Sequence, residues 1–264
     1  MVSRTIAGRS CYSVMVPENV RIGTMGFSYK DWLGNFYPQF CPQADFLQYY
    51  ASQFKTVEID STWYRIPSAQ TVAKWARITP KDFVFTAKFP QAVTHEGDLG
   101  SRAESALAFV DVMRGLDSKL GALLLQFPYS FKPEEHKLLT GLLDVLPKDM
   151  PIAVELRNKQ WLTEDLFAEL RRRDLALCLA DHPWVPRLAE KTADFQYIRM
   201  LGDRKKIESD FSHIRFDREK ELQWWREVIS DFAGQGGNIF VFFNNHYSGH
   251  APTTARRLAA ILGI

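Results

Sequence analysis

Charged side chains lie inside, or at the end of, short apolar runs that otherwise have the composition of β-strands. The residues concerned are Glu58, Asp60, Lys88, Glu155, Arg157 and Arg199. Successive side chains of a strand point to opposite faces, so Glu58 and Asp60 share one face while Val57 and Ile59 share the other. A buried charge is costly unless it is paired. Strands this apolar that keep one polar face indicate a closed barrel with charged residues at its mouth.

Eight such runs alternate with segments of helical spacing. The expected strands are 21–26, 56–62, 83–89, 122–127, 152–157, 175–181, 196–201 and 238–244. Helices are expected within 47–54, 70–78, 109–116, 139–146, 164–173, 222–232 and 253–262, whereas the stretch after Asp181 has only a weak helical pattern. This alternation favours a single parallel (β/α)8 TIM barrel, an α/β fold with outer helices, over an open doubly wound sheet.

The size of the chain fits one such barrel. It has 264 residues, of which 46% are hydrophobic, so we expect one domain over 21–264 preceded by a flexible N-terminal extension over 1–20. That extension lacks the apolar core of a signal peptide, and no apolar run is long enough to predict a membrane span. The three cysteines are widely spaced, which favours neither a disulfide framework nor a zinc knuckle. A cytoplasmic protein is therefore expected.

The residues that end the strands are the candidate site, because TIM barrels carry their chemistry at the C-terminal rim. Long loops at 27–42, 90–100 and 201–218 each follow a strand and would build up that rim. The candidates for proton transfer are Glu58, Glu155 and His95; which glutamate is acid and which is base stays open. The candidates for ligand binding are Lys88, Gln126, Arg157, Arg199, Asn244, Asn245, Tyr29, Trp32 and Trp63.

Two further segments suggest an anionic ligand. Residues 202–206 form a basic loop that begins with glycine, and residues 244–254 lead directly into the last helix. Barrels of this kind often place a phosphate there, on loop amides and a helix N-terminus. A solvated basic loop and an ordinary helix start explain the same residues equally well, and the buried charges could also form a salt-bridged plug that only fills the barrel.

Cofactor motifs are absent from the sequence. There is no Walker A motif, no GxGxxG after a strand and no GxSxG, so no cofactor is predicted. His182, His246 and His250 lack the spacing of a zinc site, although Asp181-His182 and Asn245-His246 could meet in space. A divalent metal is only weakly supported.

Several short motifs occur together in a fixed order. They are GTMGFSYKDW at 23–32, FYP at 36–38, VEI at 57–59, TP at 79–80, THE at 94–96, LQFP at 125–128, ELR at 155–157 and FNN at 243–245. In these motifs the chain resembles the YecE-like family, also called domain of unknown function seventy-two. The resemblance implies a TIM barrel and, for most members, no established activity. The chain departs from the family pattern at Asp60, where Asn is common, at Trp63, where Phe is common, and at Leu201, where many members have His.

Three functions remain in competition. The leading hypothesis is an enzyme that binds a small anionic ligand, phosphorylated or nucleotide-like, at the rim. The second is a non-catalytic binder of single-stranded nucleic acid, with Trp32, Tyr37, Trp63, Tyr64 and Trp161 as stacking platforms beside Arg204, Lys205 and Lys206; the net charge of +2 neither requires nor excludes such a partner. A glycosidase ranks lower, because retaining enzymes of this fold would have glutamates where this chain has Gln126 and Arg199.

Overall fold

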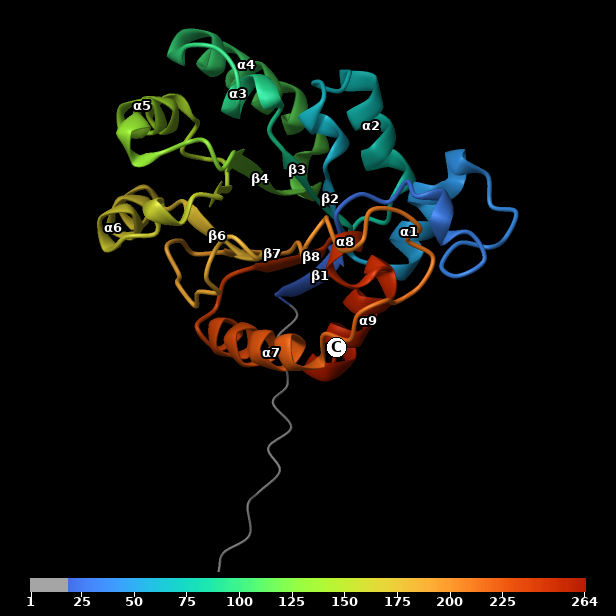
Figure 1. Ribbon diagram of the computed structural model, residues 1–264. Helices are drawn as coiled ribbons and strands as arrows, with labels where there is room; N and C mark the ends of the chain where they lie inside the picture. Colours follow the sequence, from blue (N-terminus) through green and yellow to red (C-terminus); the bar gives the residue numbers. More distant parts are fainter. Residues whose placement is uncertain (1–18) are drawn as a thin grey trace, which may run out of the picture.

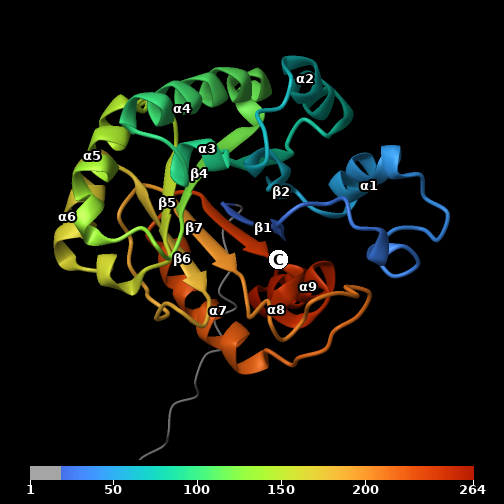
Figure 2. The same cartoon turned by 45° about the horizontal axis from the view of Figure 1, so that its top comes forward.

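Eight parallel strands stand side by side around a common axis in the computed structural model, which describes residues 19–264 (Figures 1 and 2). The strands are β1 (Val20–Thr24), β2 (Thr56–Ile59), β3 (Val84–Lys88), β4 (Leu120–Phe127), β5 (Ile152–Leu156), β6 (Ala176–Asp181), β7 (Gln196–Met200) and β8 (Ile239–Phe243). From β2 to β8 each strand pairs with the next one in the sequence, and β1 pairs with β8. The barrel expected from the sequence is thereby confirmed.

The barrel is less completely closed at the seam between β1 and β2 than between its other neighbouring strands. The two strands share one isolated parallel bridge, Met25 to Glu58, and the amide of Gly26 donates a hydrogen bond of 2.8 Å to the carbonyl oxygen of Glu58. Below this bridge β1 passes so close to β2 that a Cβ atom on Gly23 would lie 2.2 Å from the carbonyl oxygen of Thr56. Glycine at this position allows the two strands to approach.

Helices cover the outside of the barrel. The longer ones are α1 (Phe46–Gln53), α2 (Ala69–Ile78), α4 (Leu99–Met113), α5 (His136–Val145), α6 (Glu164–Arg173), α7 (Glu219–Gly234) and α9 (Ala251–Leu262). Two short helices, α3 (Gln91–Thr94) and α8 (Asn245–Ser248), follow β3 and β8. Short 3-10 segments occupy Lys30–Trp32, Gln43–Asp45, Ser61–Trp63, Arg114–Lys119, Pro133–Glu135 and Lys159–Trp161, and the fourth of these is kinked at Asp117.

The strict alternation breaks once. Residues 182–195, all of them described, connect β6 to β7 without a helix. Pro183 and Pro186 lie near the start of this segment, and a proline inside a helix removes a backbone donor and clashes with the preceding turn. The weak helical pattern after Asp181 therefore corresponds to a loop.

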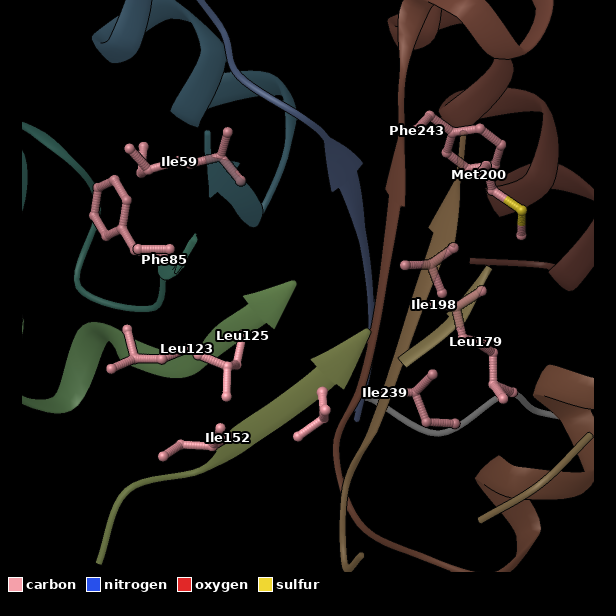
Figure 3. Close-up of a cluster of buried hydrophobic side chains, with 14 of the residues drawn as sticks. Ile59, Phe85, Leu123, Leu125, Ile152, Leu179, Ile198, Met200, Ile239 and Phe243 are labelled. Atoms are coloured by element: carbon pink, nitrogen blue, oxygen red, sulfur yellow. The ribbon is translucent and has the colours of Figure 1, made fainter. Parts of the chain in front are cut away.

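The two faces of each strand pack differently. Outward-facing side chains such as Ile59, Phe85, Leu123, Ile152 and Ile198 form a continuous apolar layer between the strands and the helices (Figure 3). Inward-facing residues form a separate cluster in the barrel interior. It combines small side chains with aromatic ones: Ala122, Leu124, Ala153, Ala176, Cys178, Tyr197, Phe240 and Phe242. Above that cluster the inward positions become polar, as the period of two in the sequence predicts.

The described part of the chain begins at Asn19. The extension expected over 1–20 lies outside the described residues except for Asn19 and Val20, and Val20 is already the first residue of β1. Over 19–264, no helix combines the length and the apolar character that crossing a bilayer requires.

Candidate active site at the C-terminal rim

Arg199 lies at the centre of the barrel mouth and binds two glutamates. Its Nε donates to Oε2 of Glu58 at 2.9 Å, and its Nη2 donates to Oε1 of the same carboxylate at 2.7 Å. The remaining nitrogen, Nη1, donates to Oε2 of Glu155. The side chains of Arg199, Glu58 and Glu155 are only 4%, 0% and 2% exposed. This is a fully buried, charge-assisted network, and the planar fork of arginine suits its bidentate part.

Glu155 is held by a second guanidinium. Its Oε1 accepts a hydrogen bond of 2.9 Å from Nε of Arg157, which follows β5. Burial alone would raise the pKa of Glu155, but the charges of Arg199 and Arg157 outweigh it and hold the pKa at about 2. Glu155 is therefore ionised at neutral pH and acts as the link between the two arginines.

Both oxygens of Glu58 accept hydrogen bonds. In addition to Arg199, the hydroxyl of Tyr197 donates to its Oε2 at 2.8 Å, and Thr86 lies 2.8 Å from that hydroxyl. These contacts join residues of β2, β3 and β7 across the barrel. The structure thus brings together three of the charges that the sequence placed in separate strands.

Lys88 lies at the end of β3 and has different partners. Its Nζ donates to Oε1 of Gln126 at 2.7 Å, and Nε2 of Gln126 donates to the carbonyl oxygen of Phe127 at 2.8 Å. The amine also lies 5.0 Å from the ring centroid of Trp63. Burial, and secondly the charge of Arg199, lowers the pKa of Lys88 to about 7. A lysine in this state is partly neutral at physiological pH.

Asp60 borders the mouth immediately after β2, and sequence reasoning did not include it among the site residues. Burial and the neighbouring charge of Glu58 raise its pKa to about 6. Its shared face with Glu58 was visible in the sequence. The sequence did not show that both oxygens of Glu58 would accept hydrogen bonds from Arg199 and Tyr197, whereas Asp60 would border the cleft.

A cleft of about 430 Å³ opens above these residues. Of the residues expected from the sequence, Tyr29, Arg157, Asn244 and Asn245 border it. Asp60, Tyr64, His182, Arg204 and His246 border it as well. This volume lies within the usual range for small-molecule sites.

Arg157 presents the free cationic surface of this cleft. Its side chain is 29% exposed, and its Nε is fixed by Glu155. Among the described residues no group accepts a hydrogen bond from its two terminal nitrogens. The guanidinium is therefore oriented but still able to bind an anion.

Comparison with known proteins decides the family. The model of the family described as "Protein of unknown function DUF72" matches residues 21–264. This chain belongs to the DUF72 family. It is 27% identical over 272 residues to the UPF0759 protein YunF of Bacillus subtilis, with 93% of this chain and 95% of YunF covered. It is 33% identical over 118 residues to the UPF0759 protein YecE of Escherichia coli, a stretch that covers 45% of this chain and 43% of YecE.

Solved structures agree with this assignment. The crystal structure of a DUF72 family protein from Thermotoga maritima superposes with a TM-score of 0.79 at 30% sequence identity, and the match covers 93% of this chain and 99% of the other. The resemblance that the short motifs carried is confirmed over nearly the whole barrel.

Three of the residues expected to bind ligand in this DUF72 protein have structural contacts instead. Trp32 is fully buried, and its Nε1 donates to Oδ1 of Asn245 at 3.2 Å, so the indole supports the loop after β8 instead of facing the cleft. Asn245 is 2% exposed, and its Oδ1 also accepts from the amide of Ala251 at 3.0 Å. Oδ1 of Asn244 accepts from the amide of His246 at 3.0 Å. Both asparagines therefore use their side-chain oxygens to shape the loop.

His95 packs away from the cleft, against Trp63. The two rings meet edge to face with centroids 5.7 Å apart, and Nδ1 of His95 lies 2.7 Å from the hydroxyl of Thr94. Burial and the charge of Lys88 lower the pKa of His95 to about 4. The imidazole is thus neutral at physiological pH, and the structure brings it beside Lys88, not beside the glutamates.

Metal ligands do not converge in the part of the DUF72 chain that the structure describes: no group of three or more His, Cys, Asp or Glu side chains is placed to hold an ion. His182 and His246 do border the same cleft. Asp181, however, points into the protein, where its Oδ2 accepts from Nε1 of Trp225 at 2.9 Å and from the hydroxyl of Tyr247 at 3.0 Å. Leu201 also borders the cleft, and it places an apolar side chain there.

Proposed function

We propose that this protein is an enzyme that binds a small anionic ligand, phosphorylated or nucleotide-like, in the rim cleft and transfers a proton there. The observation that carries the proposal is Arg157, which borders the cleft and whose Nε is anchored by Glu155 while its terminal nitrogens have no acceptor among the described residues. A guanidinium oriented in this way suits bidentate binding of a carboxylate or phosphate. Arg204, which also borders the cleft, adds a second cation.

The proton-transfer role fits Asp60 better than the glutamates. Glu155 has a pKa of about 2 and binds two guanidiniums, so it is a poor acid or base at neutral pH. Asp60 borders the cleft, and its pKa of about 6 is close to the working pH, where general acid–base catalysis is most effective. In this proposal Glu58 and Glu155 position the arginines, and Asp60 exchanges the proton.

The nucleic-acid alternative has less support. Three of its five aromatic platforms, Trp32, Tyr37 and Trp161, are at most 3% exposed. Trp63 is half-buried beside Lys88, and Tyr64 alone is well exposed. Bases cannot stack on buried rings.

A glycosidase also lacks support. Gln126 and Arg199 occupy the interior positions on β4 and β7 where the retaining enzymes of this fold would need glutamates.

The test is a thermal-shift screen of the native protein and of the Arg157→Met variant against phosphorylated metabolites, nucleotides, sugars and short oligonucleotides. A ligand at about 100 times its Kd adds roughly 2.7 kcal/mol to the free energy of unfolding, which the screen detects. We expect a small phosphorylated compound to stabilise the native protein and not the variant. The matched control is Arg226→Met, an exposed arginine on α7, which should respond like the native protein.

The dependence on salt separates the two kinds of anion. A single small anion in a pocket should lose affinity gradually as salt rises, whereas a polyanion that releases many counterions should lose it steeply. Binding of oligonucleotides with a steep slope, unchanged in Arg157→Met, would reject the proposed function in favour of the nucleic-acid alternative.

A further inference from the structure

Lys88 is a largely buried amine that has no carboxylate partner among the residues of the described barrel. Glu58 and Glu155 are the acids of the interior, but their oxygens accept hydrogen bonds from Arg199, Arg157 and Tyr197. The amine of Lys88 donates instead to the amide oxygen of Gln126. A neutral amide satisfies one N–H of the lysine without stabilising a positive charge as a carboxylate would.

The surroundings of Lys88 favour its neutral form. Burial disfavours the charged amine and Arg199 contributes a positive charge; both act against the attraction between an ammonium group and the indole face of Trp63, whose ring centroid lies 5.0 Å from the amine. The pKa of about 7 that results leaves the amine half neutral at pH 7. Other lysines of the rim, such as Lys205 and Lys206, are exposed to solvent. A desolvated lysine beside another cation is a nucleophile at neutral pH, whereas an exposed lysine is not.

Two cleft residues complete the arrangement. Arg157 and Asp60 border the cleft, and each interacts electrostatically with Lys88. Arg157 offers a place for an anionic group, and Asp60 offers a carboxyl group that can lose and regain a proton. Arg157 follows β5, Asp60 follows β2 and Lys88 ends β3. All three therefore lie at the C-terminal rim, although they come from different parts of the sequence.

We propose that Lys88 forms a Schiff base with the carbonyl carbon of a small ketone or aldehyde that carries a carboxylate or phosphate. This inference rests on the proposed function, because the anionic group of the substrate would bind Arg157.

The covalent step balances without an oxidant or a reductant. The neutral amine of Lys88 adds to the carbonyl carbon, so a C–N bond forms while the π bond of the carbonyl group breaks; the nitrogen then loses a proton and the oxygen gains one, which gives a neutral carbinolamine. The carboxyl group of Asp60 then donates a proton to the hydroxyl group, which leaves as water while the C=N bond forms. Asp60 regains a proton from solvent. The iminium that results withdraws electrons from the neighbouring carbon, as lysine enzymes of this chemical class require.

The experiment is reductive trapping with sodium cyanoborohydride at pH 7. The probes are pyruvate, a 2-oxo acid, dihydroxyacetone phosphate, a phosphorylated ketone, and acetone, which carries no anion. Intact mass and peptide mapping then locate the adducts. We expect one adduct at Lys88, formed at least about 10-fold faster than adducts at Lys205 or Lys206, with a rate that reaches half its maximum near pH 7. Whichever anionic probe reacts faster identifies the class of anion.

Variants make the result specific. Lys88→Met and Lys88→Arg should give no such adduct, and circular dichroism and Tm of both show whether they are folded. Arg157→Met should slow trapping of the anionic probes more than trapping of acetone, because acetone loses only the effect of the Arg157 charge on the amine of Lys88. Equal labelling of Lys88, Lys205 and Lys206, or a trapping rate for acetone equal to that of the anionic probes, would overturn the inference.

A separate measurement shows whether a negative trapping result rejects only the Schiff base or also the proposed anion-binding function. Each anionic probe is also tested by thermal shift without reductant, on the native protein and on Arg157→Met. Stabilisation of the native protein alone, with no adduct at Lys88, would reject the Schiff base and keep the anion site. Loss of both signals would reject both proposals.

Discussion

Arg199 binds Glu58 through two nearly parallel hydrogen bonds inside the barrel, Nε to Oε2 at 2.9 Å and Nη2 to Oε1 at 2.7 Å. Glu155 accepts from the third nitrogen of the same guanidinium. One arginine therefore compensates two buried carboxylates, and Arg157 supplies the second positive charge at the edge of the network. The arrangement is stable only as a set, because each carboxylate would be unpaired in an apolar interior without its arginine.

The first prediction concerns this set. Arg199→Met leaves Glu58 without a cation and Glu155 with Arg157 alone, so we expect it to lower the free energy of unfolding by about 3 to 5 kcal/mol at pH 7. Urea unfolding measures the change. Arg226→Met on the surface should change stability by less than about 0.5 kcal/mol.

The combined variant Glu58→Gln/Arg199→Met/Glu155→Gln removes the buried charges together. It should recover much of the stability lost in Arg199→Met, since replacing a whole buried ionic set is often nearly neutral. A cost below about 1 kcal/mol for Arg199→Met alone would mean that water reaches the network and that the site is less enclosed than its exposure indicates.

The second prediction is a pH dependence at Glu155. Burial opposes ionisation, but Arg199 and Arg157 hold the folded-state pKa at about 2, below the unfolded value of 4.5. A lowered carboxylate pKa stabilises the folded protein fully above the unfolded pKa, and this stabilisation is lost as pH falls from about 4.5 to about 2. The difference in unfolding free energy between the native protein and Glu155→Gln should therefore be constant above pH 5 and shrink below it. A difference that stays the same down to pH 2 would contradict the assignment.

The third prediction is a pH dependence at Lys88, whose altered pKa destabilises the folded protein. Burial lowers the folded-state pKa of Lys88 to about 7 from an ordinary 10.5. Below pH 7 the amine is charged in both states, and keeping that charge in the folded protein costs free energy. Lys88→Met should raise the free energy of unfolding most at pH 6, where folding would otherwise bury a charged amine. The gain should diminish as pH rises from 7 toward 10, because the amine is already neutral in the folded state and becomes neutral in the unfolded state as well. Chemical unfolding of both proteins between pH 6 and 10 measures it.

The sequence predicted the barrel well because its local signals agree with one another. All eight strands lie within a few residues of their expected positions, since each is a compact apolar run bounded by turn residues. The inward direction of Glu58 followed from the period of two. The missing helix after β6 was harder to predict, because fourteen residues can hold either a helix or a loop, and here the prolines of 182–195 prevented the helix.

The site was less predictable for a physical reason. Which charges pair across the barrel depends on the relative heights of β2, β5 and β7, and no local pattern encodes those heights. The aromatic residue Trp32 could belong to a rim or to a core, and its burial against Asn245 is a tertiary outcome. The altered pKa values of Asp60 and Lys88 come first from burial, which only the closed barrel creates, and for Lys88 also from Arg199, which is distant in sequence.

The last prediction tests the seam of the barrel at Gly23. A methyl group there would lie 2.2 Å from the carbonyl oxygen of Thr56, which belongs to the backbone of β2 and cannot rotate away. Gly23→Ala must therefore push β1 from β2, weakening the bridge between Met25 and Glu58 and shifting the carboxylate that binds Arg199. We expect a loss of about 2 to 4 kcal/mol in the free energy of unfolding and weaker anion binding in the same variant. The matched control is Gly234→Ala at the end of α7, where nothing lies within 4 Å of the added methyl group, and which should leave anion binding unchanged and raise stability by a few tenths of a kcal/mol to about 1 kcal/mol. If Gly23→Ala lost stability but bound the anion normally, the seam would support the fold without positioning the site.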